Sequence, residues 1–138
     1  MNTNKEIIYK VGDTIPELRA PPLTRLTLAL YCGASGDHNP IHVDSDYARN
    51  VAGLDDVIGP GMLTMAYLGR LLTNWVPQQA LREFQTRLLA PSKPGDGITC
   101  TGRITAIEEG SPRIIRLELQ AVNQDGKKLA AGTAVVGI

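Results

Sequence analysis

GPGMLTMAYLGRLLTNW, residues 59–75, is the longest apolar stretch of the chain and the one that decides its fold. Leu, Met and Ala dominate it and β-branched residues are few, which favours a helix over a strand. Because the stretch is apolar nearly all round, we expect a buried helix that other parts of the chain enclose. Gly59-Pro60-Gly61 opens this helix, since Pro is favoured near the first helical position, and Pro77 follows its end.

The chain after this helix has the composition of β-strands. Strands are predicted over Phe84–Leu89, Ile98–Ile107, Ile114–Val122 and Lys128–Val136. Gly- and Pro-containing segments separate them, and Asn123–Gly126 is predicted to be a hairpin turn. Helices first and a meander of about four long strands later indicate an α+β fold, with a single domain over residues 1–138. A sheet of this kind covers the apolar helix if it curls round it.

The chain before the long helix is predicted to hold shorter elements. Residues 1–22 contain several prolines, so we expect an extended segment that lies over other structure. A helix follows, and we expect Gly33 and Gly36 to end it. A second helix of one to two turns comes after the loop. The candidate N-caps are Thr24 for the first helix and Asp44 or Ser45 for the second.

Composition and charge exclude several classes of partner. Fourteen basic and fourteen acidic residues cancel, so no net field attracts nucleic acid or an anionic membrane. No apolar run reaches the roughly 18 residues of a membrane-spanning helix, and the polar start Met1–Glu6 lacks the apolar stretch of a signal peptide. Cys32 and Cys100 form neither a disulfide framework nor a metal-ligand spacing, which favours reduced, buried thiols in a cytoplasmic protein.

The segment ASGDHNPIH, residues 34–42, concentrates the titratable chemistry of the chain. It holds both histidines, and Asp37 stands five residues before His42. A carboxylate and an imidazole that converge on one point can remove one proton and deliver another. Asn39-Pro40 lies between them, and Pro restricts the backbone so that the chain can turn back. We therefore expect an enzyme. The alternative is purely structural: an Asp that caps a helix and a loop His that is hydrogen-bonded.

The same residues carry a family resemblance. Tyr31–His42, with Ala48 six residues later, closely resembles the signature of MaoC-like, (R)-specific enoyl-thioester hydratases. Asp56–Met65 resembles the second hallmark of that family, the start of its central helix. The resemblance runs from about residue 10 to the C-terminus. It implies a hot-dog fold, in which a curved antiparallel sheet wraps a long helix, and such folds normally pair through their sheets into dimers.

The resemblance also implies a reaction and a site. The family hydrates trans-2-enoyl thioesters or dehydrates (R)-3-hydroxyacyl thioesters, carried on CoA or acyl-carrier protein, without a metal or redox cofactor. By resemblance, Asp37 and His42 are the catalytic pair, and Asn39 and Pro40 form the supporting turn. The backbone N–H of Gly61, at the start of the central helix, would stabilise negative charge on the thioester oxygen.

Some positions depart from the family pattern or stay open. Many members carry His directly before the helix-opening Gly, where this chain has Pro60, but the amide of Gly61 is retained. His38 occupies a variable position of the motif and is expected to face solvent. Three basic residues either meet the phosphates of a carrier or are ordinary surface charges: Arg25, Arg87 and Lys93.

Two other functions also stay open. Some relatives act as heteromers in which one chain carries the motif and the other shapes the acyl tunnel, so this chain could be the motif-bearing subunit of a heterodimer rather than a homodimer. A hot-dog thioesterase is the second alternative; the Asp-x-Asn-Pro-x-His spacing argues against it, although the fold does not. The sequence does not indicate acyl-chain length, the carrier, or which of Asp37 and His42 is the base.

Overall fold

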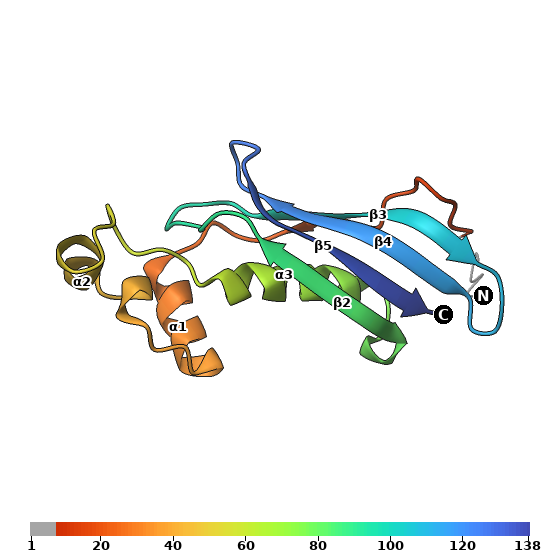
Figure 1. The fold of residues 1–138 in the computed structure, drawn as a ribbon, viewed down its shortest axis with the longest axis horizontal. Helices are drawn as coiled ribbons and strands as arrows, with labels where there is room; N and C mark the ends of the chain where they lie inside the picture. Colours follow the sequence, from red (N-terminus) through yellow and green to blue (C-terminus); the bar gives the residue numbers. More distant parts are fainter. Residues whose placement is uncertain (1–7) are drawn as a thin grey trace, which may run out of the picture.

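The computed structural model describes residues 8–138. The polar start predicted at Met1–Glu6 lies outside these residues. Five strands form one antiparallel sheet in the order β1-β3-β4-β5-β2 (Figure 1). The strands are β1 Leu18–Arg19, β2 Leu81–Leu88, β3 Thr99–Glu108, β4 Ile114–Val122 and β5 Lys128–Gly137. The four predicted long strands are confirmed, and β2 begins earlier than the sequence indicated. Only β3, β4 and β5 follow one another as a meander, because β2 pairs with β5 at the far edge of the sheet and not with β3.

Three α-helices accompany the sheet: α1 Arg25–Ser35, α2 Ser45–Asn50 and α3 Gly61–Trp75. Two short 3-10 turns, Pro40–His42 and Gln78–Ala80, join them to their neighbours. The N-cap of α1 is Thr24, as predicted, and the N-cap of α2 is Asp44 rather than Ser45. The prediction that Gly33 ends the first helix is wrong. The helix continues to Ser35, and only Gly36 adopts the left-handed conformation that ends it.

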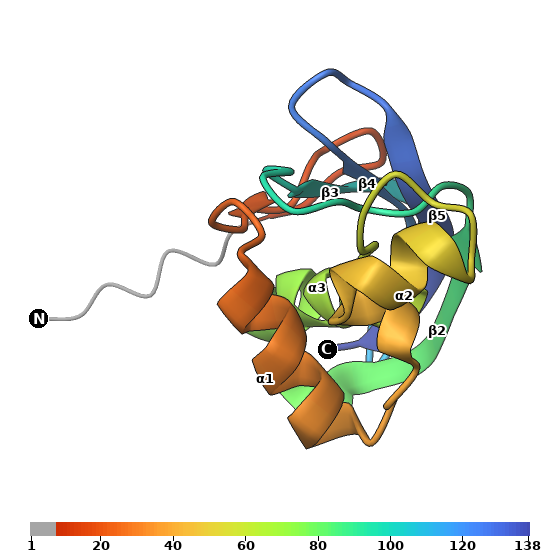
Figure 2. The same cartoon turned by 90° about the vertical axis from the view of Figure 1, so that its left-hand side faces the viewer.

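The hydrophobic core lies between α3 and the inner face of the sheet. On β4, Ile115, Leu117 and Leu119 are buried while the residues between them are exposed, as expected for a sheet with one covered face. Leu68 and Leu72 of α3 are fully buried against this face. In two perpendicular views the sheet curves over α3, and α1 and α2 lie together at one end of it (Figures 1 and 2). This is the hot-dog fold that the family resemblance implied.

One side of α3 departs from the expectation of an enclosed helix. Three residues of this side, spaced four positions apart, are exposed: Met62, Ala66 and Arg70. Met62 is 55% exposed. The sheet covers only the opposite side of the helix, and the short helices α1 and α2 cover only its end. Some of the apolar residues of this helix are therefore left exposed by the single chain.

The N-terminal segment is extended, as its prolines predict. Leu18–Arg19 pairs with β3, and Thr14 forms an isolated bridge with Arg103. Trp75, at the end of α3, donates a hydrogen bond of 2.8 Å to the Tyr9 hydroxyl. None of the helices formed by residues 8–138 combines the length and the hydropathy needed to cross a bilayer.

Candidate active site

Asp37 and His42 come together in the loop between α1 and α2. Asp37 Oδ2 lies 3.4 Å from His42 Nε2. The side chain of Asp37 is 40% exposed, whereas that of His42 is only 8% exposed. The carboxylate therefore faces solvent and the imidazole stands behind it. At this separation one water molecule can contact both atoms, so the two side chains can exchange protons with a single bound molecule.

The local backbone explains how five residues bring the two side chains together. The second carboxylate oxygen of Asp37, Oδ1, accepts from the Asn39 N–H at 3.2 Å, which leaves Oδ2 for His42. Asn39 Oδ1 in turn accepts from the Ile41 N–H at 3.2 Å, and Asn39 caps the 3-10 turn Pro40–His42. Two successive Asx turns of this kind reverse the chain within a few residues. His38 is exposed to solvent, as predicted.

A backbone carbonyl fixes the protonation pattern of His42. His42 Nδ1 lies 2.7 Å from the Ile58 carbonyl oxygen. Because a carbonyl can only accept, Nδ1 donates, and the Nε2 atom of the neutral ring keeps its lone pair free toward Asp37. The Ile58 N–H returns a hydrogen bond of 3.1 Å to the Ile41 carbonyl. The sequence offers no signal for this contact, because its acceptor is a main-chain atom.

Gly61 begins α3, three residues after Ile58, and its surroundings leave no room for a larger side chain. A Cβ atom at Gly61 would collide with the side chain of Leu88, and one at Gly59 would collide with buried Ser92. The N–H groups at the first turn of a helix have no acceptor within the helix, and that of Gly61 has none among the described residues. This end of α3 can therefore donate to a ligand, with the helix dipole in its favour.

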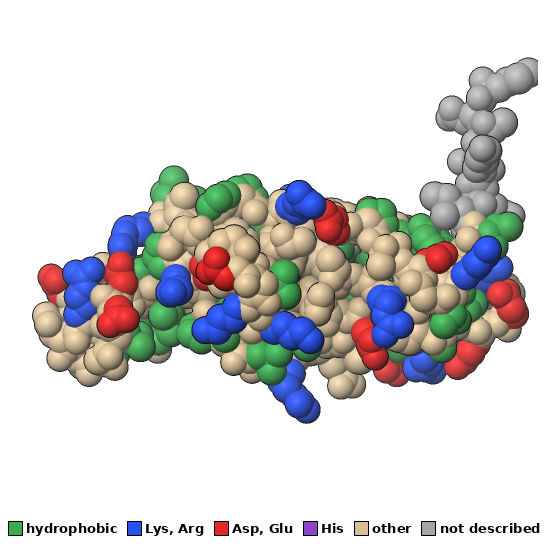
Figure 3. All heavy atoms as spheres, turned by 90° about the horizontal axis from the view of Figure 1, so that it is seen from above, with side chains coloured by type: hydrophobic (Ala, Val, Ile, Leu, Met, Phe, Trp, Pro, Cys, Tyr) green, Lys and Arg blue, Asp and Glu red, His purple; other side chains and the backbone are tan. Residues whose placement is uncertain are grey.

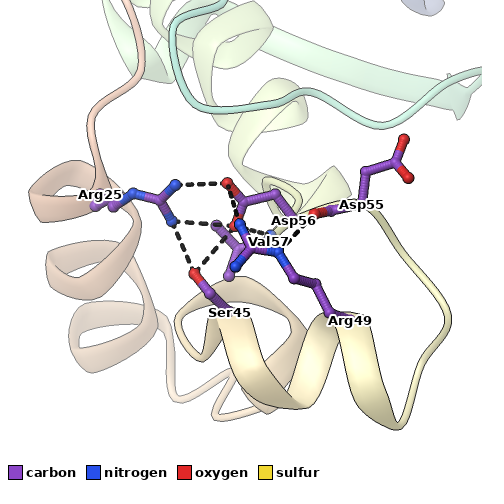
Figure 4. A network of polar contacts seen from close by, with 6 residues as sticks. All are labelled: Arg25, Ser45, Arg49, Asp55, Asp56 and Val57. Carbon is purple, nitrogen blue, oxygen red and sulfur yellow. Dashed lines mark hydrogen bonds and ion pairs between the residues drawn. The ribbon is translucent and has the colours of Figure 1, made fainter.

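Asp56 is the centre of a polar network beside the site (Figure 4). Its Oδ1 accepts from the Val57 N–H at 2.7 Å, from Ser45 Oγ at 3.0 Å and from Arg25 Nη1 at 3.2 Å. Its Oδ2 accepts from Arg25 Nη2 at 2.5 Å and lies 3.7 Å from Arg49 Nη2. The hydrogen bonds from Arg25 hold the pKa of the Asp56 carboxyl well below its usual range. Arg25 therefore forms an ion pair with Asp56. The sequence suggested only a phosphate contact or an ordinary surface charge for Arg25.

Two further titratable side chains lie near Asp37. Burial raises the pKa of the Tyr31 hydroxyl and of the Cys32 thiol, and the negative charge of Asp37 raises both further. Cys32 and Cys100 are buried and free, as predicted, and burial raises the pKa of Cys100 to about 12. Among residues 8–138 no group of three or more His, Cys, Asp and Glu side chains is arranged to hold a metal ion.

A hollow of about 930 Å³ lies elsewhere, over the outer face of the sheet. Its lining includes polar residues of β2 to β5 such as Gln85, Arg103 and Thr133, and it does not include Asp37, His42 or Gly61. Seen from above the view of Figure 1, basic and acidic side chains are interspersed over the molecule (Figure 3). No field of a single sign gathers on this face, in keeping with the net charge of zero.

Comparison with known proteins agrees with the hot-dog fold of this domain. The (R)-hydratase from A. caviae involved in PHA biosynthesis is 27% identical, with a TM-score of 0.81, over 93% of this chain and 96% of that one. The R-hydratase PhaJ1 from Pseudomonas aeruginosa is 25% identical, with a TM-score of 0.80, over 93% and 81%. The ChsH1-ChsH2 complex from Mycobacterium tuberculosis shares the fold, with a TM-score of 0.80 at 21% identity over 95% and 99%.

The sequence itself matches the family described as MaoC like domain over residues 10–125. The chain belongs to this family. None of the curated proteins compared matches it significantly. The family and its R-hydratase neighbours support hydration or dehydration as the type of reaction.

Proposed function

We propose that the chain adds water to trans-2-enoyl thioesters, or removes it from (R)-3-hydroxyacyl thioesters, with Asp37 and His42 as the acid–base pair. The observation that carries the proposal is the 3.4 Å approach of Asp37 Oδ2 to the Nε2 atom of His42, whose Nδ1 is already bound to the Ile58 carbonyl. The substrate would be carried on CoA or on acyl-carrier protein.

Hydration requires two proton transfers and one stabilised charge. A water bound between the two side chains gives one proton to the pair while its oxygen bonds to C3, and the pair returns a proton to C2. Either side chain can be the base in this scheme, because both reach the same water. The charge that develops on the thioester oxygen would be met by the Gly61 N–H at the start of α3. Pro60 supplies no donor here, so the first free amide is that of Gly61.

The reaction involves no net oxidation or reduction. Addition of water to the double bond needs only proton transfer and charge stabilisation, both of which the named groups can supply. We therefore propose that the chain acts without a metal or redox cofactor.

Activity assays test the reaction directly. Asp37→Asn and His42→Ala are each expected to lower crotonyl-CoA hydration by at least ~100-fold, the lower end of what one acid–base group provides. His38→Ala is the matched control, since His38 is exposed in the same loop and should keep near wild-type activity. Near wild-type rates in either site variant would refute the proposal. Release of free thiol instead of loss of enoyl absorbance would identify a thioesterase. A panel of enoyl-CoA esters of increasing chain length would define the acyl group.

The partner we propose is a second copy of the same chain, paired along β2. This strand is an edge of the sheet and pairs only with β5 among the described residues. An unpaired edge next to exposed apolar residues such as Met62 and Leu88 is a natural site for strand addition. Because Leu88 also packs over the position of Gly61, such a partner would lie beside the proposed oxyanion donor.

The charges on β2 favour an identical partner. Glu83, Gln85 and Arg87 share the outer face of the sheet and are exposed. In a two-fold antiparallel pair of β2 strands, a register centred on Gln85 sets Glu83 opposite the partner's Arg87, twice per dimer. Opposite charges directly across a strand pair stabilise it. The fold neighbour ChsH1-ChsH2 is a complex of two chains, so a heterodimer is the competing assembly. Sedimentation and activity of the purified chain alone separate the two, since an inactive chain would require another subunit.

A further inference from the structure

The loop that carries Asp37 and His42 runs between two helices that share one anchor. The loop leaves the end of α1 and enters the start of α2. Arg25, the first residue of α1, and Ser45, the first residue of α2, both donate to the carboxylate of Asp56. Arg25 Nη1 also donates to Ser45 Oγ at 3.1 Å. One carboxylate therefore holds the two helices on either side of the loop in a fixed relation.

The same carboxylate holds the backbone that orients the imidazole. Asp56 stands two residues before Ile58, and the N–H of the intervening Val57 donates to Asp56 Oδ1. The N–H groups of Ile58 and Gly59 are also bound, to the carbonyls of Ile41 and Ser92. Every amide from 57 to 59 is thus hydrogen-bonded. The Asp56 carboxylate joins this segment to Arg25 of α1 and Ser45 of α2. The Ile58 carbonyl accepts the Nδ1 proton of His42 at the end of this chain of contacts.

We propose that Asp56, together with Arg25 and Ser45, is a positioning residue: it holds the Ile58 carbonyl against Nδ1 of His42, which keeps the ring in the form whose Nε2 lone pair faces Asp37. The catalytic consequence rests on the proposed function, whereas the effect on the ring does not. The side chain of Asp56 is 31% exposed and takes no part in the hydrophobic core, so its dense bonding calls for a reason other than core packing.

Nuclear magnetic resonance of the two imidazoles tests this directly. The chain holds only two histidines, and His38→Ala assigns their signals. With ¹⁵N-labelled histidine, the neutral ring of His42 in the wild type is expected to carry its proton on Nδ1 and none on Nε2, because Nδ1 lies against the Ile58 carbonyl. Exposed His38 serves as the internal reference in the same sample.

Asp56→Ala is the decisive variant, and Asp55→Ala is its matched control. Asp55 carries the same charge one residue earlier, and its carboxylate points away from the network, with only its main-chain oxygen accepting from Arg49. Asp56→Ala is expected to abolish the fixed Nδ1–H pattern of His42 and to lower kcat by about ten- to a hundredfold, because misplacement of a catalytic group by about 1 Å has effects of this size. KM should change by less than about threefold, since no substrate contact is removed.

The outcomes separate this inference from the proposed function. An Asp56→Ala protein that is folded and keeps both the His42 pattern and kcat overturns the inference. Loss of the pattern with no loss of kcat supports the positioning effect and refutes the catalytic role of His42. If Asp56→Ala does not fold, Arg25→Gln removes the bidentate partner while the carboxylate keeps its bonds to Ser45 and Val57. That variant must then show the same change in the His42 pattern for the inference to stand.

Discussion

Reversal of one charge on β2 provides the sharpest test of the proposed dimer. In the register centred on Gln85, each dimer contains two pairs of Glu83 with the partner's Arg87. Glu83→Arg replaces both attractive pairs with Arg–Arg pairs. An exposed ion pair contributes up to about 1 kcal/mol, and like charges across a strand pair cost a similar amount. If each pair loses about 0.5 kcal/mol of attraction and gains about 0.5 kcal/mol of repulsion, its contribution changes by about 1 kcal/mol. The two pairs of the dimer then weaken the association free energy by about 2 kcal/mol, which raises Kd roughly thirtyfold.

The compensating variant makes this test specific to the register. Glu83→Arg combined with Arg87→Glu restores two opposite-charge pairs, so its dimer should dissociate much as the wild type does. Each single reversal should weaken the dimer, and the difference should shrink at high salt because exposed charges are screened. Asp125→Arg, an equal charge change in the exposed turn between β4 and β5, is the control and should leave the dimer intact. Sedimentation over a concentration series measures each Kd. Failure of the double reversal to recover the dimer would rule out this register.

Three further predictions concern the framework of the site. Gly59→Ala should lower the free energy of unfolding, measured in urea, by about 1–3 kcal/mol because its Cβ collides with buried Ser92. Adding Ser92→Gly should suppress this loss. If the two substitutions instead change the free energy of unfolding additively, the contact is contradicted. Leu72→Ala should cost about 2–5 kcal/mol, measured in the same way, because Leu72 is fully buried under the sheet. The lowered pKa of Asp56 means that its stabilising effect is present above the usual carboxyl pKa of about 4 and is lost as the pH falls below it. The stability difference between wild type and Asp56→Asn should therefore be largest near neutral pH and shrink toward pH 3.

The sequence determined the elements of the fold closely because their signals are local. The apolar run with its Gly-Pro-Gly start predicts α3, which spans Gly61–Trp75, and the alternation after Pro112 predicts β4, which spans Ile114–Val122. The failure at Gly33 has a local cause as well. Glycine in a helix costs only about 1 kcal/mol, and helices continue through it when the surrounding turns are bonded. The exposed side of α3 could not be predicted from the sequence. The apolar character of a helix indicates that it is buried, but it does not indicate which part of the chain, or which other chain, buries it.

The sequence by itself determined which chemical groups the site contains and, through Asn39-Pro40, that Asp37 and His42 can approach each other. Only the tertiary structure decided how His42 is oriented. Its partner is the main-chain oxygen of Ile58, and every residue type carries such an oxygen, so no residue pattern marks it. The anchor Asp56 was equally hidden, since its bond to Arg25 joins positions 31 residues apart. Contacts between distant segments form only when helices and sheet pack, and for that reason the reacting groups could be named from the sequence while their support could not.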